Sequence, residues 1–204
     1  MKLQASSLIL IVIALGLGGT AYLLERHPSS QSEISGEPIF TFEEDQVQAL
    51  TIKTRQQTLA FVRSERPRQP QQQSKWLMTT PLKAPASEAS VAYLLNLLVS
   101  ARSDRQLNVS VSQRSEFGLD RPLATIIVKL KNQETHQLVL GKPDFNHSSL
   151  YAQAISPAEG SPPPQIPKNI QVLLVPTTFE NAVNRPLPEW KWGNSDQPVP
   201  VDPD

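Results

Sequence analysis

An uncharged apolar run near the start of the chain constrains the fold more than any other sequence feature. Residues 6–24 carry no charge, and most of them are Leu, Ile, Val, Ala or Gly. As a helix rising ~1.5 Å per residue, this run nearly matches the ~30 Å hydrocarbon core of a bilayer. Only a helix satisfies its own backbone hydrogen bonds within a single segment in lipid. The sequence therefore predicts one transmembrane anchor over residues 1–26.

The residues around this run predict its orientation. Lys2 and the amino terminus precede it, and the long part that follows is translocated whatever its charge. The positive-inside rule then places the amino terminus in the cytoplasm and the remainder in the periplasm or a lumen. A cleaved signal peptide is the alternative, because Gly19, Thr20 and Ala21 are small residues of the kind a signal peptidase prefers. The apolar residues at 22–24 continue past that point and favour the anchor.

The totals exclude several classes of function. Lys plus Arg and Asp plus Glu both number 19, so the basic excess of a nucleic-acid-binding protein is missing. There is no Cys, which excludes disulfides, thiol catalysis and zinc sites built on Cys. The 19 Pro fall largely in clusters, and these mark irregular segments.

Alternating apolar residues after a polar linker at 27–38 predict a first group of short strands and one helix. Leu50 and Ile52 fall on one face of the clearest strand. Ser87 is a suitable N-cap for a helix at 87–101, which has an apolar stripe at helical spacing. The strands of this group are expected at 39–42, 49–54, 58–63 and 75–79.

A second group of strands follows, with short helical turns at 113–117, ended by Gly118, and from Thr177 or Thr178 to Val183. The segments at 64–74 and 156–168 are polar or Pro-rich and are predicted to be loop insertions. The Pro-rich tail at 186–204 is expected to lack regular structure. The strands of the second group are expected at 105–109, 125–131, 135–140, 150–154 and 170–175.

These elements predict an α+β fold: a transmembrane helix followed by an antiparallel β-rich domain with one long helix and short helices. Each half of the domain runs through a hairpin and a strand ending near Pro to a helix. This recurrence suggests two similar β-β-β-α lobes, at 39–102 and 103–185. Coincidence among common elements explains the recurrence equally simply, since the two halves share little residue identity.

A Trp strand closing in Pro, a helix with a small residue at its cap, a Gly-Leu-Asp turn before Pro, a hairpin ending in Gly and a Tyr strand follow one another along the chain. They are Trp76, Pro81, Ser87, Gly118-Leu119-Asp120 with Pro122, Gly141 and Tyr151. Through these features residues 39–185 resemble the domain of unknown function DUF4340, and the stretch at 181–190 resembles cyanobacterial members in particular. The resemblance implies membrane anchoring and brings no assigned activity. It also implies a link to gliding-motility-type ABC transporter systems, in which some relatives take part.

Sequence motifs for catalysis are lacking. Gly141-Lys142 is no phosphate loop, because His136 stands where the first Gly is required and Pro143 has no N–H to donate. Serine-hydrolase elbows of the G-x-S-x-G kind are absent. Two carboxylates can meet from anywhere in a fold, but nothing selects a pair among the acids.

Two polar clusters are candidate binding sites, and each also fits a solvated loop. The first consists of Asp144, Asn146 and His147, with Glu134 and His136 nearby in sequence. These residue types can bind a metal ion, but their spacing matches no known metal-binding motif. The second is a basic patch suited to anionic headgroups or an acidic partner, and consists of Arg63, Arg66, Arg68 and Lys75. The aromatic residues Phe61, Trp76 and Tyr151 are interpreted as packing residues.

The sequence thus predicts a membrane-anchored extracytoplasmic protein that binds or scaffolds another envelope or membrane protein. No catalytic, cofactor-binding or metal-binding residue, and no cofactor, is predicted, and the protein is expected not to be an enzyme. Its expected partners are the bilayer, through residues 6–24, and a protein rather than nucleic acid. The alternatives are an accessory subunit of an ABC-transporter-like system and an envelope hydrolase with dispersed carboxylates.

Overall fold

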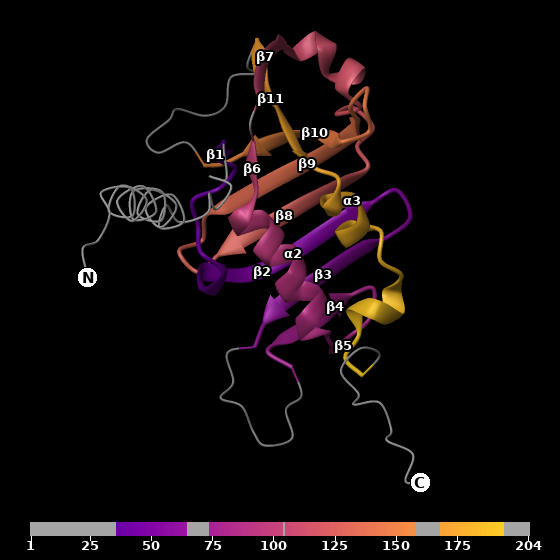
Figure 1. Cartoon of the computed structure of the whole chain (residues 1–204). Helices are drawn as coiled ribbons and strands as arrows, with labels where there is room; N and C mark the ends of the chain where they lie inside the picture. Colours follow the sequence, from indigo (N-terminus) through magenta and orange to yellow (C-terminus); the bar gives the residue numbers. More distant parts are fainter. Residues whose placement is uncertain (1–35, 65–73, 104, 158–167, 194–204) are drawn as a thin grey trace, which may run out of the picture. The chain divides into compact units, whose positions relative to one another are not determined.

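A computed structural model describes residues 36–64, 74–103, 105–157 and 168–193 (Figure 1). The chain divides into two compact units, at Met1–Ser35 and Gly36–Asp204, and all the described residues belong to the second. Among these residues, no helix is long and apolar enough to cross a bilayer. The anchor predicted at residues 1–26, including the run at 6–24, lies outside the described residues.

The second unit is built on one nine-stranded antiparallel sheet (Figure 1). Two further strands of two residues each, β1 (Glu37–Pro38) and β6 (Arg102–Ser103), pair with each other and form a separate antiparallel sheet. In spatial order the nine strands are β5 (Ala84–Pro85), β4 (Trp76–Thr80), β3 (Thr58–Arg63), β2 (Val47–Thr54), β8 (Ala124–Leu130), β9 (Thr135–Pro143), β10 (Ser149–Ile155), β11 (Asn169–Pro176) and β7 (Gln106–Ser110).

Two meanders meet at the centre of this sheet. Strands β2, β3 and β4 run outward in chain order on one side, and β8, β9, β10 and β11 run outward on the other. They join where β2 pairs with β8, with Leu50 opposite Val128 and Ile52 opposite Ile126. All four of these side chains are buried, so the junction lies in the core. The chain therefore repeats a meander, but both copies share one sheet.

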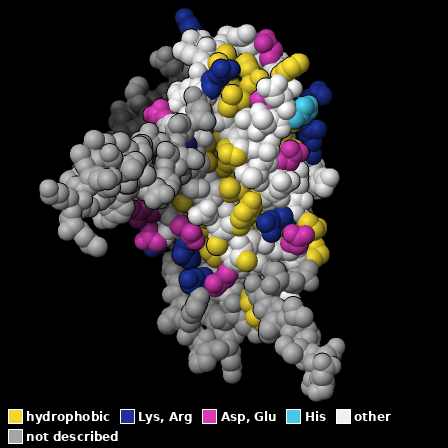
Figure 2. All heavy atoms as spheres, viewed as in Figure 1, with side chains coloured by type: hydrophobic (Ala, Val, Ile, Leu, Met, Phe, Trp, Pro, Cys, Tyr) yellow, Lys and Arg dark blue, Asp and Glu magenta, His cyan; other side chains and the backbone are white. Residues whose placement is uncertain are grey.

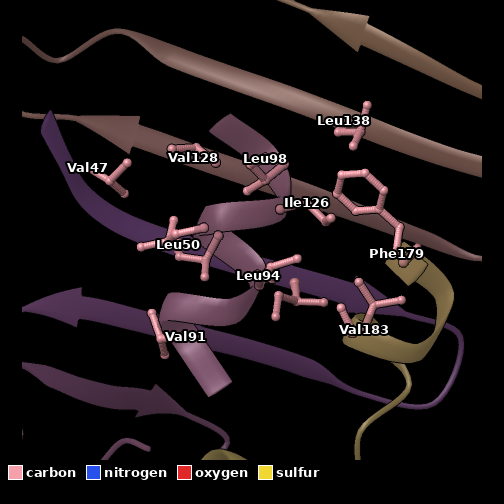
Figure 3. Close-up of a cluster of buried hydrophobic side chains, with 14 of the residues drawn as sticks. Val47, Leu50, Val91, Leu94, Leu98, Ile126, Val128, Leu138, Phe179 and Val183 are labelled. Atoms are coloured by element: carbon pink, nitrogen blue, oxygen red, sulfur yellow. The ribbon is translucent and has the colours of Figure 1, made fainter. Parts of the chain in front are cut away.

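The helix α2 (Glu88–Ser100) covers one face of the sheet, where the main core lies (Figure 3). Ser87 caps it, because its side chain accepts a hydrogen bond from the Ser90 backbone N–H. The second helix, α3 (Thr178–Val183), adds Phe179 and Val183 to the same core. The apolar residues that α2 buries against the sheet are Val91, Leu94, Leu95 and Leu98.

The opposite face of the second meander carries a smaller apolar cluster. Val139 belongs to it, whereas its neighbours Leu138 and Leu140 point into the main core, as the alternation of a strand requires. The 3₁₀ segment η2 (Val111–Phe117) and Leu119 cover this cluster. Gly118 ends η2 with a φ of 71°, in the left-handed region that glycine adopts without strain.

The expected fold class is wrong in two respects. The described residues form mainly β-sheet with short helices, and α2, at 13 residues, is an ordinary helix rather than a long one. The two lobes are replaced by one continuous sheet, because β2 and β8 bond to each other and bury the same face. The proposed boundaries at 39–102 and 103–185 stay a prediction about chain organisation.

Two local expectations are also corrected. No strand forms at 39–42, although Phe40 and Phe42 are buried there. The segment after Pro186 begins with η3 (Leu187–Trp190), and the Trp190 side chain is fully buried against Phe61, with ring centroids 5.3 Å apart. Burial of one large aromatic ring orders a stretch whose Pro content indicated an irregular tail.

Candidate functional site

A pocket of about 530 Å³ lies at one end of the sheet. Four segments meet there: the turn between β2 and β3, the connection from η2 to β8, the last residues of β9, and Asn184 just after α3. We call this the pocket end. Its volume is in the range of small-molecule sites. The lining residues are Thr54, Arg55, Gln56, Gly118, Arg121, Leu123, Gly141, Lys142, Pro143 and Asn184.

The charged groups of this pocket are all cations. Arg55, Arg121 and Lys142 line it, and no Asp or Glu does. Arg55 donates a 2.8 Å hydrogen bond from Nη2 to the Arg121 backbone carbonyl, which ties the β2–β3 turn to the segment before β8. Within the part of the chain that the structure describes, the side chains of Arg121 and Lys142 make no ion pair. Two of the three cations are thus available to a ligand.

A shallower depression adjoins the pocket and shares part of its lining. It has a volume of about 540 Å³, and Thr54, Arg55 and Arg121 border both spaces. Lys53 also lines the depression, which adds a fourth cation at the pocket end. The positive surface therefore extends from β9 across the connection before β8 to the end of β2.

Two glycines allow the pocket walls to approach each other. A Cβ at Gly141 would lie 2.1 Å from the carbonyl oxygen of Phe117, and a Cβ at Gly118 would lie 2.8 Å from the Lys142 backbone nitrogen. Both distances are below any real carbon contact, so η2 packs on β9 only because these positions lack a side chain. This close approach places Lys142 beside the turn that carries Arg121.

The residue types of the pocket suit binding of an anion. Guanidinium and ammonium groups donate charge-assisted hydrogen bonds to phosphate and carboxylate oxygens. Gln56 and Asn184 supply side-chain amides, whereas the Thr54 hydroxyl already bonds within its own turn to Gln57. No imidazole or carboxylate stands among the lining residues to move a proton. The described lining residues therefore suit a negatively charged group and include no acid–base pair.

Charge on the face drawn in Figure 2 is mixed. In Figure 2 Lys and Arg side chains alternate with Asp and Glu, and hydrophobic side chains lie between them. This matches the overall balance of 19 basic and 19 acidic residues. The basic character of the pocket is therefore local.

The sequence-predicted metal cluster is split between opposite ends of the sheet. Asp144 and His147 lie in the β9–β10 turn, next to the pocket end, whereas Glu134 and His136 lie at the start of β9. The Asp144 carboxylate accepts hydrogen bonds from the backbone N–H groups of Ser148 and Ser149, and that of Ser149 contributes most to lowering its pKa. Among the described residues, no three His, Asp or Glu side chains gather as a metal site.

His136 lies at the end of the sheet opposite the pocket, which we call the His136 end. Its ring packs against Phe40 and Phe42, with centroids 5.6 and 5.1 Å away. Nδ1 lies 3.0 Å from the Ser156 hydroxyl, and Nε2 lies 3.7 Å from a carboxylate oxygen of Glu134. Burial lowers the pKa of His136, and Glu134 opposes that shift only in part.

The predicted basic patch is divided. Arg63 donates to the backbone carbonyls of Val47 and Glu44 and lies 4.8 Å from the centre of the Trp76 ring, so its role is in packing. Arg66 and Arg68 lie outside the described residues. The Lys75 backbone N–H donates to the Glu88 carboxylate.

The three aromatic residues expected to pack do so. Phe61 and Trp76 are in the main core, and Tyr151 contacts Phe117 edge-on, with ring centroids 5.0 Å apart.

Arg55 and Arg121 carry no signal in the sequence that marks them as site residues. They are 66 positions apart and share no motif, and only the β2–β8 pairing brings them together. Gly141-Lys142 lacks the pattern of a phosphate loop, yet both residues line the basic pocket.

Comparison with known proteins gives one match. The family model described as "Domain of unknown function (DUF4340)" matches residues 76–162. The match begins at β4 and includes η2, β8, β9 and β10, and so covers Arg121 and Lys142 but not Arg55. No curated protein and no solved structure matches the chain.

Proposed function

We propose that this chain is a non-enzymatic binding protein whose pocket end captures an anionic group of a ligand or partner. The observation that carries the proposal is the convergence of Arg55, Arg121 and Lys142 on one pocket that no carboxylate lines. Like charges brought together repel one another, and neither Arg121 nor Lys142 makes an ion pair within the described residues. A bound anion would supply the missing charge.

The proposal includes a location, which is drawn from the sequence. The uncharged run at residues 6–24 would hold the chain at a bilayer, with the binding domain in the periplasm or a lumen. A scaffold of this kind would bring an anionic ligand, or a partner bearing one, to the membrane surface.

The test is calorimetric titration of the full chain, in detergent micelles, with inorganic phosphate and with malonate. We expect saturable binding that weakens as salt is added, because the contacts are charged and close to solvent. Arg121→Gln should weaken it about tenfold, since a hydrogen bond to a charged group contributes about 1.5–3 kcal/mol.

Lys129→Gln is the matched control. Lys129 is an exposed cation at the far end of β8, where it pairs in register with Thr135. Its replacement should leave the affinity unchanged. Equal affinities in the wild type and Arg121→Gln, or no heat of binding at all, would remove the proposal.

A further inference from the structure

One aromatic side chain beside the pocket is almost completely exposed. Phe145 has 95% of its surface in solvent, and it lies two residues beyond Pro143, which lines the pocket. Every other large apolar side chain that the structure describes as exposed is at least half covered: Val62, Leu77, Leu82, Tyr93 and Ile155 have exposed fractions between 37% and 43%. Phe145 is thus the outlier, and it occurs next to the positive surface.

The turn that carries Phe145 is closed by its own hydrogen bonds. Oδ1 of Asp144 accepts from the backbone N–H groups of Ser148 and Ser149, at 2.9 and 3.0 Å. The His147 backbone N–H donates to the Asp144 carbonyl at 3.1 Å, and His147 has a φ of 55°. These bonds set the path of the backbone on both sides of Phe145, so the ring is held out from the sheet.

Cations and one projecting aromatic ring are the groups that a protein presents to an anionic lipid surface. Lys and Arg attract anionic headgroups, and an aromatic ring enters the layer between headgroups and acyl chains. At the pocket end the cations are Lys53, Arg55, Arg121 and Lys142. The carboxylate of Asp144 is occupied by its turn, and neither it nor Asp120 lines the pocket.

We propose that the pocket end is a membrane-contact site: a headgroup phosphate of an anionic phospholipid occupies the pocket while Phe145 enters the bilayer interface. This rests on the proposed function and names its ligand. A protein partner fits less well. A stable protein interface buries about 800 Å² on each side, whereas the apolar surface beside the pocket is one projecting ring, Phe145, and the other exposed apolar side chains are more than half covered.

The absence of Cys makes a direct test possible, because one introduced thiol is the sole site for a label. The full chain carrying Phe145→Cys is labelled with a polarity-sensitive fluorophore and reconstituted in vesicles. One set contains phosphatidylcholine alone and the other includes phosphatidylglycerol. Ile155→Cys is the matched control, because Ile155 is an exposed apolar residue at the opposite end of β10.

We expect a blue shift of the label at position 145 in phosphatidylglycerol vesicles and none at position 155. Adding Arg121→Gln and Lys142→Gln to Phe145→Cys should abolish that shift. Vesicles of phosphatidylcholine alone should leave both labels in a water-like environment. Thermal unfolding by circular dichroism checks that each variant is folded.

The outcomes separate this inference from the proposed function. If the label at position 145 stays water-like in both lipids while calorimetry shows phosphate binding, the lipid proposal falls and the anion pocket stands, with a soluble phosphate compound as its ligand. A shift that is equal in both lipids and insensitive to the two Gln substitutions overturns headgroup recognition. Loss of both the shift and phosphate binding removes both proposals.

Discussion

The two ends of the sheet differ in whether their basic side chains are buried or exposed. At the His136 end a titratable ring is packed against Phe40 and Phe42, and burial lowers its pKa. At the pocket end Arg121 and Lys142 are exposed and lack an ion pair within the described residues. Burial removes charge from a group that can lose a proton, whereas exposure leaves charge available to a ligand. Under the proposed function, the first end serves packing and the second serves binding.

The largest expected effect concerns the close approach that shapes the pocket. Gly141→Ala puts a methyl group where the Phe117 carbonyl oxygen lies 2.1 Å away, so η2 must separate from β9. We expect a loss of about 3 kcal/mol in the free energy of unfolding, the upper part of the overpacking range. Denaturant unfolding of the full chain measures it.

Gly193→Ala is the control for this experiment. Gly193 has a φ of 97°, in the left-handed region, whereas Gly141 does not, and a Cβ at Gly193 meets nothing within 4 Å. It should cost only the backbone strain, about 1–2 kcal/mol. If Gly141→Ala is no more harmful than Gly193→Ala, the pocket walls are not held by this contact.

A second expected effect is the pH dependence contributed by the His136 end. Because the folded pKa of His136 is lowered from 6.5, the unfolded chain binds more protons than the folded chain in the window below pH 6.5. The contribution of the neutral His136 ring to folding stability is therefore fully present above pH 6.5, and it is lost as the pH falls through that window. His136→Gln should flatten this part of the curve of unfolding free energy against pH. An unchanged slope would show that the ring is not held neutral by its surroundings.

A third, more local effect concerns the β9–β10 turn. Asp144→Ala removes the acceptor of two backbone N–H groups, whereas Asp144→Asn keeps an oxygen at the same place. Hydrogen exchange at Ser148 and Ser149 should accelerate in Asp144→Ala and much less in Asp144→Asn. The His136 end should be unaffected in both. Equal protection in all three proteins would mean that the turn is set by other contacts.

The smallest expected effect is on the stability of the Lys142→Gln variant, and it shows whether Lys142 serves binding or structure. Lys142→Gln relieves repulsion among the pocket cations, so it should leave the folded chain as stable as before or a few tenths of a kcal/mol more stable at low salt. The same substitution should weaken phosphate binding. Parallel unfolding and calorimetric measurements compare the two, with Lys129→Gln as control. A clear loss of stability would assign Lys142 a structural role.

The sequence predicted the local elements well, because each depends on neighbouring residues. In the structure Leu50 and Ile52 are both buried on one face of their strand, Ser87 caps its helix, and Gly118 ends the helical segment before it. It did not predict that the halves share one sheet, since the β2–β8 pairing joins residues more than 60 positions apart. The pocket was missed for the same reason: Arg55 and Arg121 become neighbours only through that pairing.

The most direct test of the account is an NMR titration of the full chain, in micelles, with inorganic phosphate. Backbone amide shifts report where the anion binds without any substitution. We predict saturable shifts at Arg55, Arg121 and Lys142, and unchanged signals at Phe42 and His136. Shifts centred on the His136 end, or spread evenly over the exposed cations, would contradict the central claim that the fold builds one anion site at the pocket end.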